Sequence, residues 1–162
     1  MINSTKYWDE RAAAVYTYKG EKFYTITAIP YYFLRRRIIL DMINSQIEDG
    51  NHVCDFGCGD GEYIRLLSSR KKNCTFHGVD ISEQMIRDAR QRNVSDMYTW
   101  EISGDGIHKP EFFDVVYSSA IFAHLSDENV DSLFSNIHSH IRDCSGGADA
   151  SFCVSRRHPI GM

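Results

Sequence analysis

A glycine-rich turn after a short apolar run constrains this chain more than any other feature of its sequence. Residues 53–63 read VCDFGCGDGEY, with glycine at every second position of the turn. Such spacing predicts a tight turn between a strand and a helix, with a backbone that a ligand can approach closely. Asp55, Asp60 and Glu62 flank the turn, so that ligand has to tolerate negative charge. The glycines are Gly57, Gly59 and Gly61.

After this turn the chain alternates apolar, strand-like runs with helical patterns. Strands that alternate with helices predict a doubly wound α/β fold, a three-layer α/β/α arrangement with a parallel sheet between helices. Ligands of such sheets bind beyond the carboxyl ends of the strands, which is where the glycine turn lies. Ser82 suits the N-cap of one helix. The expected strands are 52–57, 74–80, 97–103, 112–119 and 150–155, and the expected helices are 62–70, 82–93 and a segment that starts at Ser126 or Asp127.

The first fifty residues stand apart as an aromatic-rich segment. Apolar residues recur at helical spacing after Pro30, which suits the first turn of a helix, and Gly50 suits its end. We therefore expect residues 1–50 to form a helical extension and residues 51–162 to form the core, as one domain overall. The recurring apolar residues are Leu34, Ile38, Ile39, Met42, Ile43 and Ile47.

Composition limits the class of protein. The chain has 162 residues, 43% of them apolar, and a net charge of −4. These values predict one soluble domain without the basic face of a dedicated nucleic-acid binder, and the run Arg35–Arg37 is expected to be a solvated helix face. Five cysteines without disulfide-type spacing favour a reduced, cytoplasmic protein, and no pattern predicts a metal site. Neither a signal peptide nor a membrane-spanning segment is expected.

Three ligands compete for the glycine turn. A P-loop would need Gly-Lys-Ser/Thr, which the chain lacks, and a dinucleotide motif would need glycine where the chain has Glu62. Both ligands also carry phosphate, which a nearby carboxylate repels. S-adenosylmethionine has no phosphate and carries two cations, a sulfonium and an ammonium. The acidic turn therefore favours S-adenosylmethionine, with Asp55 accepting from the ammonium directly or through a water.

The sequence D-F-G-C-G-D-G at 55–61 resembles the first motif of Rossmann-like, class I S-adenosylmethionine-dependent methyltransferases. The resemblance continues through GVDIS at 78–82, Gly-Asp-Gly at 104–106, the strand FDVVYSSAIFAHL at 113–125 and Gly146-Gly147, and it covers about residues 52 to 155. It implies a Rossmann-like sheet and S-adenosylmethionine as cofactor, with S-adenosylhomocysteine (SAH) as product.

The family's cofactor-binding roles carry over onto matching positions. Asp80 resembles the acid that pairs with both ribose hydroxyls, and Ile81 and Met85 resemble the apolar floor under adenine. Asp105 resembles the residue beside the adenine amino group, although Gly-Asp-Gly is also an ordinary turn sequence. The full expected set is Asp55, Phe56, Gly57, Cys58, Gly59, Asp60, Asp80, Ile81, Met85, Gly104, Asp105, Gly106 and Ser118.

These motifs do not identify the catalytic residue or the residues that would cover the cofactor. His124 lies where the family has its active site, and it is a candidate general base, a substrate partner or a structural histidine. The family's N-terminal segment often folds over the cofactor, so the tyrosines there either close the site or pack on the sheet. The candidate lid residues are Tyr7, Tyr16, Tyr18 and Tyr24.

The absence of two family motifs limits the classes of methyl acceptor that we expect. The strand that ends at Ser119 lacks the [DNS]-P-P-[YFW] signature of nucleic-acid base methyltransferases, and the paired-glutamate loop of arginine methyltransferases is absent. We therefore expect a small-molecule acceptor, methylated on O, N or C, and no nucleic acid. The family's final strand pair has no counterpart before Met162, which suggests a shortened C-terminus, an uncovered edge and a possible homodimer. A non-catalytic cofactor-binding or interaction subunit is the alternative, and a dehydrogenase is a more distant one.

Overall fold

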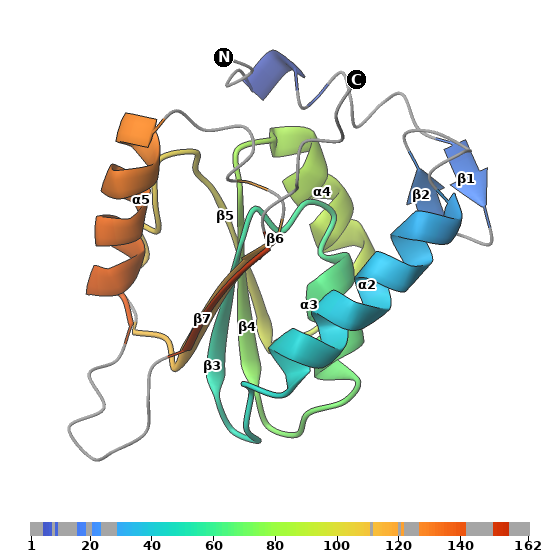
Figure 1. Cartoon of the computed structure of the whole chain (residues 1–162), viewed down its shortest axis with the longest axis horizontal. Helices are drawn as coiled ribbons and strands as arrows, with labels where there is room; N and C mark the ends of the chain where they lie inside the picture. The colour runs from blue at the N-terminus through green and yellow to red at the C-terminus, as the bar shows by residue number, and fades with distance from the viewer. Residues whose placement is uncertain are drawn as a thin grey trace.

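The chain folds as a parallel sheet with helices on both faces, as a computed structural model shows (Figure 1). The structure describes residues 5–7, 9, 16–18, 21–23, 29–110, 112–119, 121, 127–141 and 151–155. This is the doubly wound, Rossmann-like arrangement that the sequence predicts. The strands of this sheet are β3 (His52–Phe56), β4 (Thr75–Asp80), β5 (Tyr98–Ile102), β6 (Val115–Ser119) and β7 (Ser151–Ser155), and the helices are α2 (Ile29–Asn44), α3 (Glu62–Ser68), α4 (Glu83–Arg92) and α5 (Asp127–Ser139).

The sheet has the order β5-β4-β3-β6-β7, and every neighbouring pair is parallel. The strand order reverses between β3 and β6, so this is the switch point at which such sheets bind ligands. In register, Asp55 of β3 lies between Gly78 of β4 and Tyr117 of β6. The acid of the glycine motif is therefore at the centre of the sheet. The edge strands of the described sheet are β5 and β7, and a homodimer through an edge stays a prediction.

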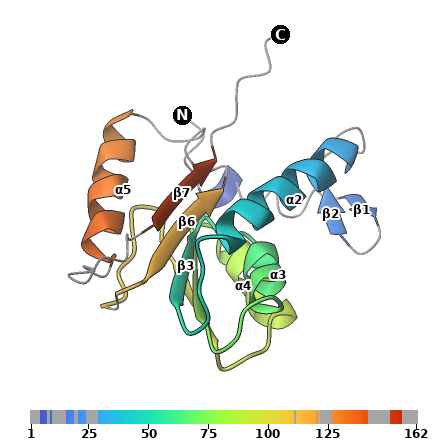
Figure 2. The same ribbon diagram turned by 60° about the horizontal axis from the view of Figure 1, so that its bottom comes forward.

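Two apolar clusters hold the helices on the sheet. Successive residues of a strand point to opposite faces, so Val53 joins the cluster under α2, α3 and α4, and Cys54 joins the one under α5. Figures 1 and 2 show the same division, with α5 alone on its side. The largest side chains of the two clusters include Phe76 and Tyr117 on the first face and Phe56 and Phe113 on the second.

The N-terminal part differs from the expected helical extension. Two short strands, β1 (Tyr16–Tyr18) and β2 (Glu21–Phe23), form a separate antiparallel sheet, and Figure 2 shows it beside the start of α2. Three-residue strands are too short to show an alternating pattern, so the sequence does not predict this pair. The helix after Pro30 is confirmed, but it ends at Asn44 instead of near Gly50.

Helix α2 buries only half of its expected apolar stripe. Ile39 and Ile43 are buried in the first-face cluster, whereas Leu34, Ile38 and Met42 are 62%, 58% and 43% exposed. Because these two sets lie on different sides of the helix, the sequence pattern could not tell which side faces the sheet. Whether residue 50 divides two structural parts stays a prediction. Among the described helices, none is long and apolar enough to span a membrane.

Candidate cofactor site

The glycine turn is tied directly to the neighbouring strand. The backbone amides of Gly57 and Cys58 donate to the carbonyl of Val79 at 2.7 and 3.0 Å, and the amide of Gly61 donates to the carbonyl of Cys58 at 3.0 Å. The three turn glycines have φ angles of 82°, 55° and 75°. Backbone in this left-handed region favours glycine, which explains the spacing in the sequence. Helix α3 then begins at Glu62.

The three turn glycines differ in what surrounds them. A Cβ atom on Gly57 would lie 2.5 Å from the side chain of Ile121, and one on Gly61 would lie 2.6 Å from the ring of Trp100. A Cβ atom on Gly59 would meet no atom within 4 Å. Two of the glycines therefore make room for the protein's own side chains. Gly59 is the one that faces open space, as a ligand-binding turn requires.

Asp80 joins the glycine turn to the start of α4. Its Oδ2 accepts from the backbone amide of Gly59 and its Oδ1 accepts from the amide of Ser82, both at 2.8 Å. Burial raises the pKa of Asp80, although the Ser82 and Gly59 amides oppose this shift. Each carboxylate oxygen still has a lone pair for a further donor, so a ligand with two neighbouring hydroxyls fits this position.

Asp55 is a buried acid whose Oδ2 has no hydrogen-bond partner among the described residues. Its side chain is 2% exposed. Burial raises the pKa of Asp55 to about 8; the charge of Asp80 adds to this shift, and the Tyr117 hydroxyl opposes it. The hydroxyl oxygens of Tyr117 and Ser118 are likewise buried. That of Tyr117 lies near Asp55 but not in hydrogen-bond geometry, so neither hydroxyl has a hydrogen-bond partner among the described residues. Buried polar groups are normally paired, so this group at the carboxyl ends of β3 and β6 indicates a polar ligand.

A third side of the site comes from α2 and α3. Tyr63 of α3 follows the glycine turn by two residues; burial raises its pKa, while Ser119 and the positive charge of Arg35 oppose the shift. The Nη2 atom of Arg35 is buried and has no hydrogen-bond partner among the described residues.

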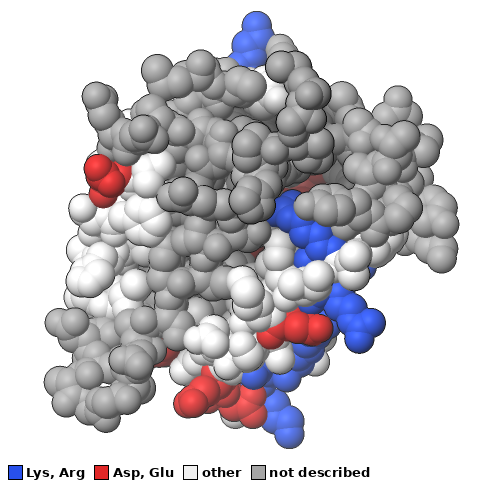
Figure 3. All heavy atoms as spheres, viewed as in Figure 1, with Lys and Arg blue, Asp and Glu red and all other residues white. Residues whose placement is uncertain are grey.

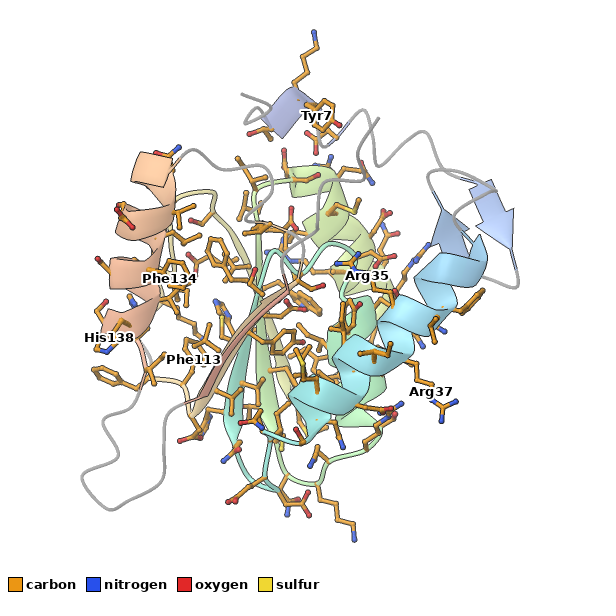
Figure 4. The ribbon with its side chains drawn as sticks, viewed as in Figure 1. Tyr7, Arg35, Arg37, Phe113, Phe134 and His138 are labelled. Atoms are coloured by element: carbon orange, nitrogen blue, oxygen red, sulfur yellow. The ribbon has the colours of Figure 1, made fainter. Side chains whose placement is uncertain are left out.

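The three consecutive arginines of α2 have three different surroundings. Arg36 pairs with Glu62 at the start of α3, and its guanidinium lies 4.8 Å from the centre of the Phe33 ring. Arg37 is 82% exposed and lies 3.9 Å from Asp41. In Figure 4, Arg35 points toward the carboxyl ends of the strands and Arg37 points away from the protein. The expectation of a solvated helix face is therefore correct for Arg37 and wrong for Arg36, which is 17% exposed, and for the buried nitrogen of Arg35.

Several predicted cofactor residues are engaged with the protein instead. The side chain of Phe56 belongs to the second-face cluster and that of Cys58 to the first, so only their backbone is available to a ligand. Asp60 pairs with Arg92 at 2.6 Å. A Cβ atom on Gly106 would lie 2.5 Å from the side chain of Asn136 on α5. The roles predicted for Asp60 and Gly106 in cofactor binding stay predictions.

The predicted adenine residues are partly brought together. A Cβ atom on Gly104 would lie 2.6 Å from Ile81, so the loops after β4 and β5 are in contact. Met85 is half-buried on the first turn of α4. Asp105 is exposed; hydrogen bonds with His108 at 2.9 Å and Ser103 at 3.0 Å lower its pKa. Its contact with adenine stays a prediction.

The N-terminal segment contacts the start of α4 through Asp9, a residue that no sequence motif marks. Asp9 Oδ1 accepts from the Ser82 hydroxyl and, at 3.3 Å, from the amide of Gln84. Ser82 itself caps α4, as predicted, by accepting from the amide of Met85 at 3.2 Å. Tyr7 lies above this end of the sheet in Figure 4. Tyr24 and His124 lie outside the described residues, and only the backbone of Tyr16 and Tyr18 is described.

Sequence reasoning also missed Arg35, Tyr63 and Trp100. Trp100 explains two glycines at once, because a Cβ atom on Gly61 or Gly78 would lie 2.6 Å from its ring. None of the three carries a motif. The only signal for Arg35 was its position in a basic run, and for Tyr63 its place directly after the turn.

The described surface in one view of the molecule is not uniformly basic. In the view of Figure 3, Lys and Arg atoms lie mainly on the side where Figure 1 shows α2, with Asp and Glu atoms between them. On this face the described residues do not form the continuous basic surface that most nucleic-acid binders present.

Known proteins resemble both the sequence and the fold. The methyltransferase-domain family matches residues 53–144. A tRNA (carboxymethyluridine(34)-5-O)-methyltransferase of Arabidopsis thaliana is 35% identical over 86 residues, which cover 51% of this chain and 19% of that protein. A trans-aconitate 2-methyltransferase of Rhodopseudomonas palustris is 35% identical over 78 residues, or 47% of this chain and 29% of that protein. The matches thus span less than a third of these relatives.

A solved structure shows the same fold over a larger share of this chain than the sequence matches do. The structure of DhpI in complex with SAH has a TM-score of 0.63 and 19% identity, and the alignment covers 85% of this chain and 62% of that one. The parallel sheet with an acidic glycine turn at its switch point defines the Rossmann-like class of S-adenosylmethionine-dependent methyltransferases. This chain belongs to the methyltransferase-domain family, whose cofactor is S-adenosylmethionine.

Proposed function

We propose that this chain binds S-adenosylmethionine at the carboxyl ends of β3 and β4 and transfers its methyl group to a small-molecule acceptor. The observation that carries the proposal is the pair of acids at the glycine turn. Asp80 holds the turn through Gly59, and Asp55 is a buried acid with an unpartnered oxygen. A cationic ligand without phosphate matches both.

The residues present fit the cofactor part by part. Asp80 would accept from the ribose hydroxyls, with Ile81 and Met85 under the adenine. Gly59, which has open space at its Cβ position, would let the methionyl group lie against the turn. Asp55 would accept from the ammonium of the methionyl group, and the hydroxyls of Tyr117 and Ser118, which have no hydrogen-bond partner among the described residues, would bind the polar groups beside it.

Methyl transfer requires the protein mainly to position the two reactants. S-adenosylmethionine supplies a methyl group on a good leaving group, so orientation and exclusion of water can provide most of the acceleration. Asp80 and the glycine turn hold one reactant in place. A base is needed only for an acceptor that is protonated at working pH, and we propose His124 for that role. Tyr7, Tyr16, Tyr18 and Tyr24 are the proposed wall on the N-terminal side.

A small acceptor is favoured by charge and by missing motifs. The net charge is −4, and the strand before Ser119 carries no base-binding signature. One relative acts on tRNA by its name and another on trans-aconitate, so both acceptor classes belong in an activity test. We also propose a cytoplasmic location, based on the reduced cysteines, of which the three with described side chains are buried thiols.

Two experiments separate the proposal from its rivals. Calorimetric titration with SAH and with NAD distinguishes a methyltransferase from a dehydrogenase, and we expect binding of SAH alone. Transfer of radiolabelled methyl from S-adenosylmethionine to small carboxylic acids, amines, phenols and tRNA then tests turnover. Binding of SAH without transfer to any of these acceptors would favour the non-catalytic subunit.

A further inference from the structure

Arg35 is a half-buried cation that the proposed roles leave unused. Among the three arginines of α2, Arg36 is paired with Glu62 and Arg37 extends outward near Asp41. The Nη2 atom of Arg35 is buried and has no hydrogen-bond partner in the described part of the chain. An unpaired buried donor on a charged group is costly, so a protein retains one where a ligand completes it.

The position of Arg35 places this donor at the proposed site. In Figure 4 its side chain leaves α2 on the side of the carboxyl ends of β3 and β6. Its positive charge also opposes the rise in the pKa of Tyr63, the residue two positions after the glycine turn. The end of the sheet therefore combines a cation on α2 with an acid on β3.

The chemistry of a guanidinium selects the ligand. Arg presents a planar fork of donors that matches a carboxylate with two parallel hydrogen bonds. Phosphate would match it too, but the charge of Asp80, and that of Asp55 once a cation favours its ionised form, would repel a multiply charged anion at this end of the sheet. A single carboxylate beside a cation, as in an α-amino acid group, is the best complement to Arg35 and Asp55 together.

We propose that Arg35 binds a carboxylate in this site, and the inference rests on the proposed function. Two sources share this chemistry: the methionyl carboxylate of S-adenosylmethionine and a carboxylate on the acceptor. If the first is correct, Arg35 recognises the intact cofactor. If the second is correct, Arg35 selects carboxylic acids as acceptors.

The test compares S-adenosylmethionine with its decarboxylated form, which keeps the sulfonium and the amine. Both are titrated by calorimetry into the natural chain, Arg35→Gln, Arg35→Lys and the exposed control Arg37→Gln. For a cofactor carboxylate, Arg35→Gln should weaken binding of S-adenosylmethionine by about 10- to 100-fold. Arg35→Lys should weaken it less, and Arg37→Gln should not change it. Affinity for the decarboxylated form should be equal in all four proteins.

A second arm addresses the acceptor, with trans-aconitate titrated into the SAH-saturated proteins. If Arg35→Gln leaves cofactor affinity unchanged and weakens trans-aconitate binding, the carboxylate belongs to the acceptor. The inference is overturned if Arg35→Gln matches the natural chain in both arms, or weakens both cofactor forms equally. If the natural chain binds neither cofactor form, the proposed function fails, and this inference fails with it.

Discussion

The carboxylate of Asp80 accepts a hydrogen bond from the backbone amide of Gly59 at 2.8 Å, and this contact joins the end of β4 to the glycine turn after β3. Its other oxygen accepts from the amide of Ser82 at the same distance. One side chain thus fixes both the turn and the start of α4. Any ligand that lies against the turn will depend on this acid.

Replacing Asp80 by asparagine should destabilise the free protein. The amide has one acceptor oxygen, so its NH₂ group must face one of the two backbone N–H donors. We expect a loss of about 1–3 kcal/mol in the free energy of unfolding, measured by urea denaturation. Glu83→Gln, at the first residue of α4, is the control. Its partner Arg87 is 48% exposed, so this variant should change the free energy of unfolding little. Equal stability of the two variants would contradict the role of Asp80 in holding the turn.

Proton release should accompany cofactor binding. Asp55 has a pKa of about 8 in the free protein, so it is largely protonated at pH 7, and a cationic ligand favours its ionised form. Affinity for S-adenosylmethionine should therefore rise as pH increases from 6 to 8. Calorimetry at pH 7 in two buffers of different ionisation enthalpy measures the protons released. Asp55→Asn should abolish this release, and a natural chain that releases no proton would argue against contact between Asp55 and the cation.

The same acid should make stability fall with increasing pH. A carboxyl whose pKa is raised from 3.8 to about 8 by folding stabilises the folded state below the unfolded pKa, and this contribution is lost as pH rises through about 8. Asp55→Asn removes this dependence. Its advantage in melting temperature over the natural chain should grow between pH 5 and pH 8.5. An unchanged difference across that range would show that Asp55 is not protonated in the folded protein.

Gly50, which lies outside the glycine turn, is a matched control for a test of whether a ligand lies against Gly59. Both have positive φ, and an added Cβ atom would meet nothing within 4 Å at either position. Alanine should therefore cost about 1–2 kcal/mol of stability at each. Only Gly59→Ala should also weaken SAH binding, because the new methyl group enters the space proposed for the ligand. If both variants bind SAH like the natural chain, the cofactor does not lie against Gly59.

Asp9 should stabilise α4 from outside the core. Its carboxylate accepts from the Ser82 hydroxyl and the Gln84 amide, so Asp9→Ala should cost about 0.5–2 kcal/mol, the range for loss of a helix cap. Asp9→Asn keeps an acceptor oxygen and should cost less. Urea denaturation measures the free energy of unfolding of both variants. Equal stability of Asp9→Ala and the natural chain would mean that Asp9 does not stabilise the start of α4.

Local sequence patterns predicted the parts of this fold that depend on local chemistry. The strands that end at Phe56, Asp80 and Ser119 and the Ser82 cap follow from apolar runs and capping preferences, and the structure confirms them. The parallel arrangement of the sheet, and the place of the glycine turn at the carboxyl end of its strand, follow from the alternation of strands and helices. The order of the strands does not follow from it.

Contacts between distant segments could not be predicted in this way. A sequence does not show that Gly61 lies against Trp100 or that Gly106 lies against Asn136. Arg35 had the same local pattern as Arg37, and only the packing of α2 against α3 separates a half-buried arginine from an exposed one.

The most direct test of the account is a calorimetric titration of the natural chain and Asp80→Ala with SAH. We predict a single site in the natural chain and an affinity loss of about 1–3 kcal/mol in the variant, the usual cost of losing a charge-assisted hydrogen bond. A folded natural chain that binds no SAH, or an Asp80→Ala protein that binds it equally well, would contradict the proposed cofactor site.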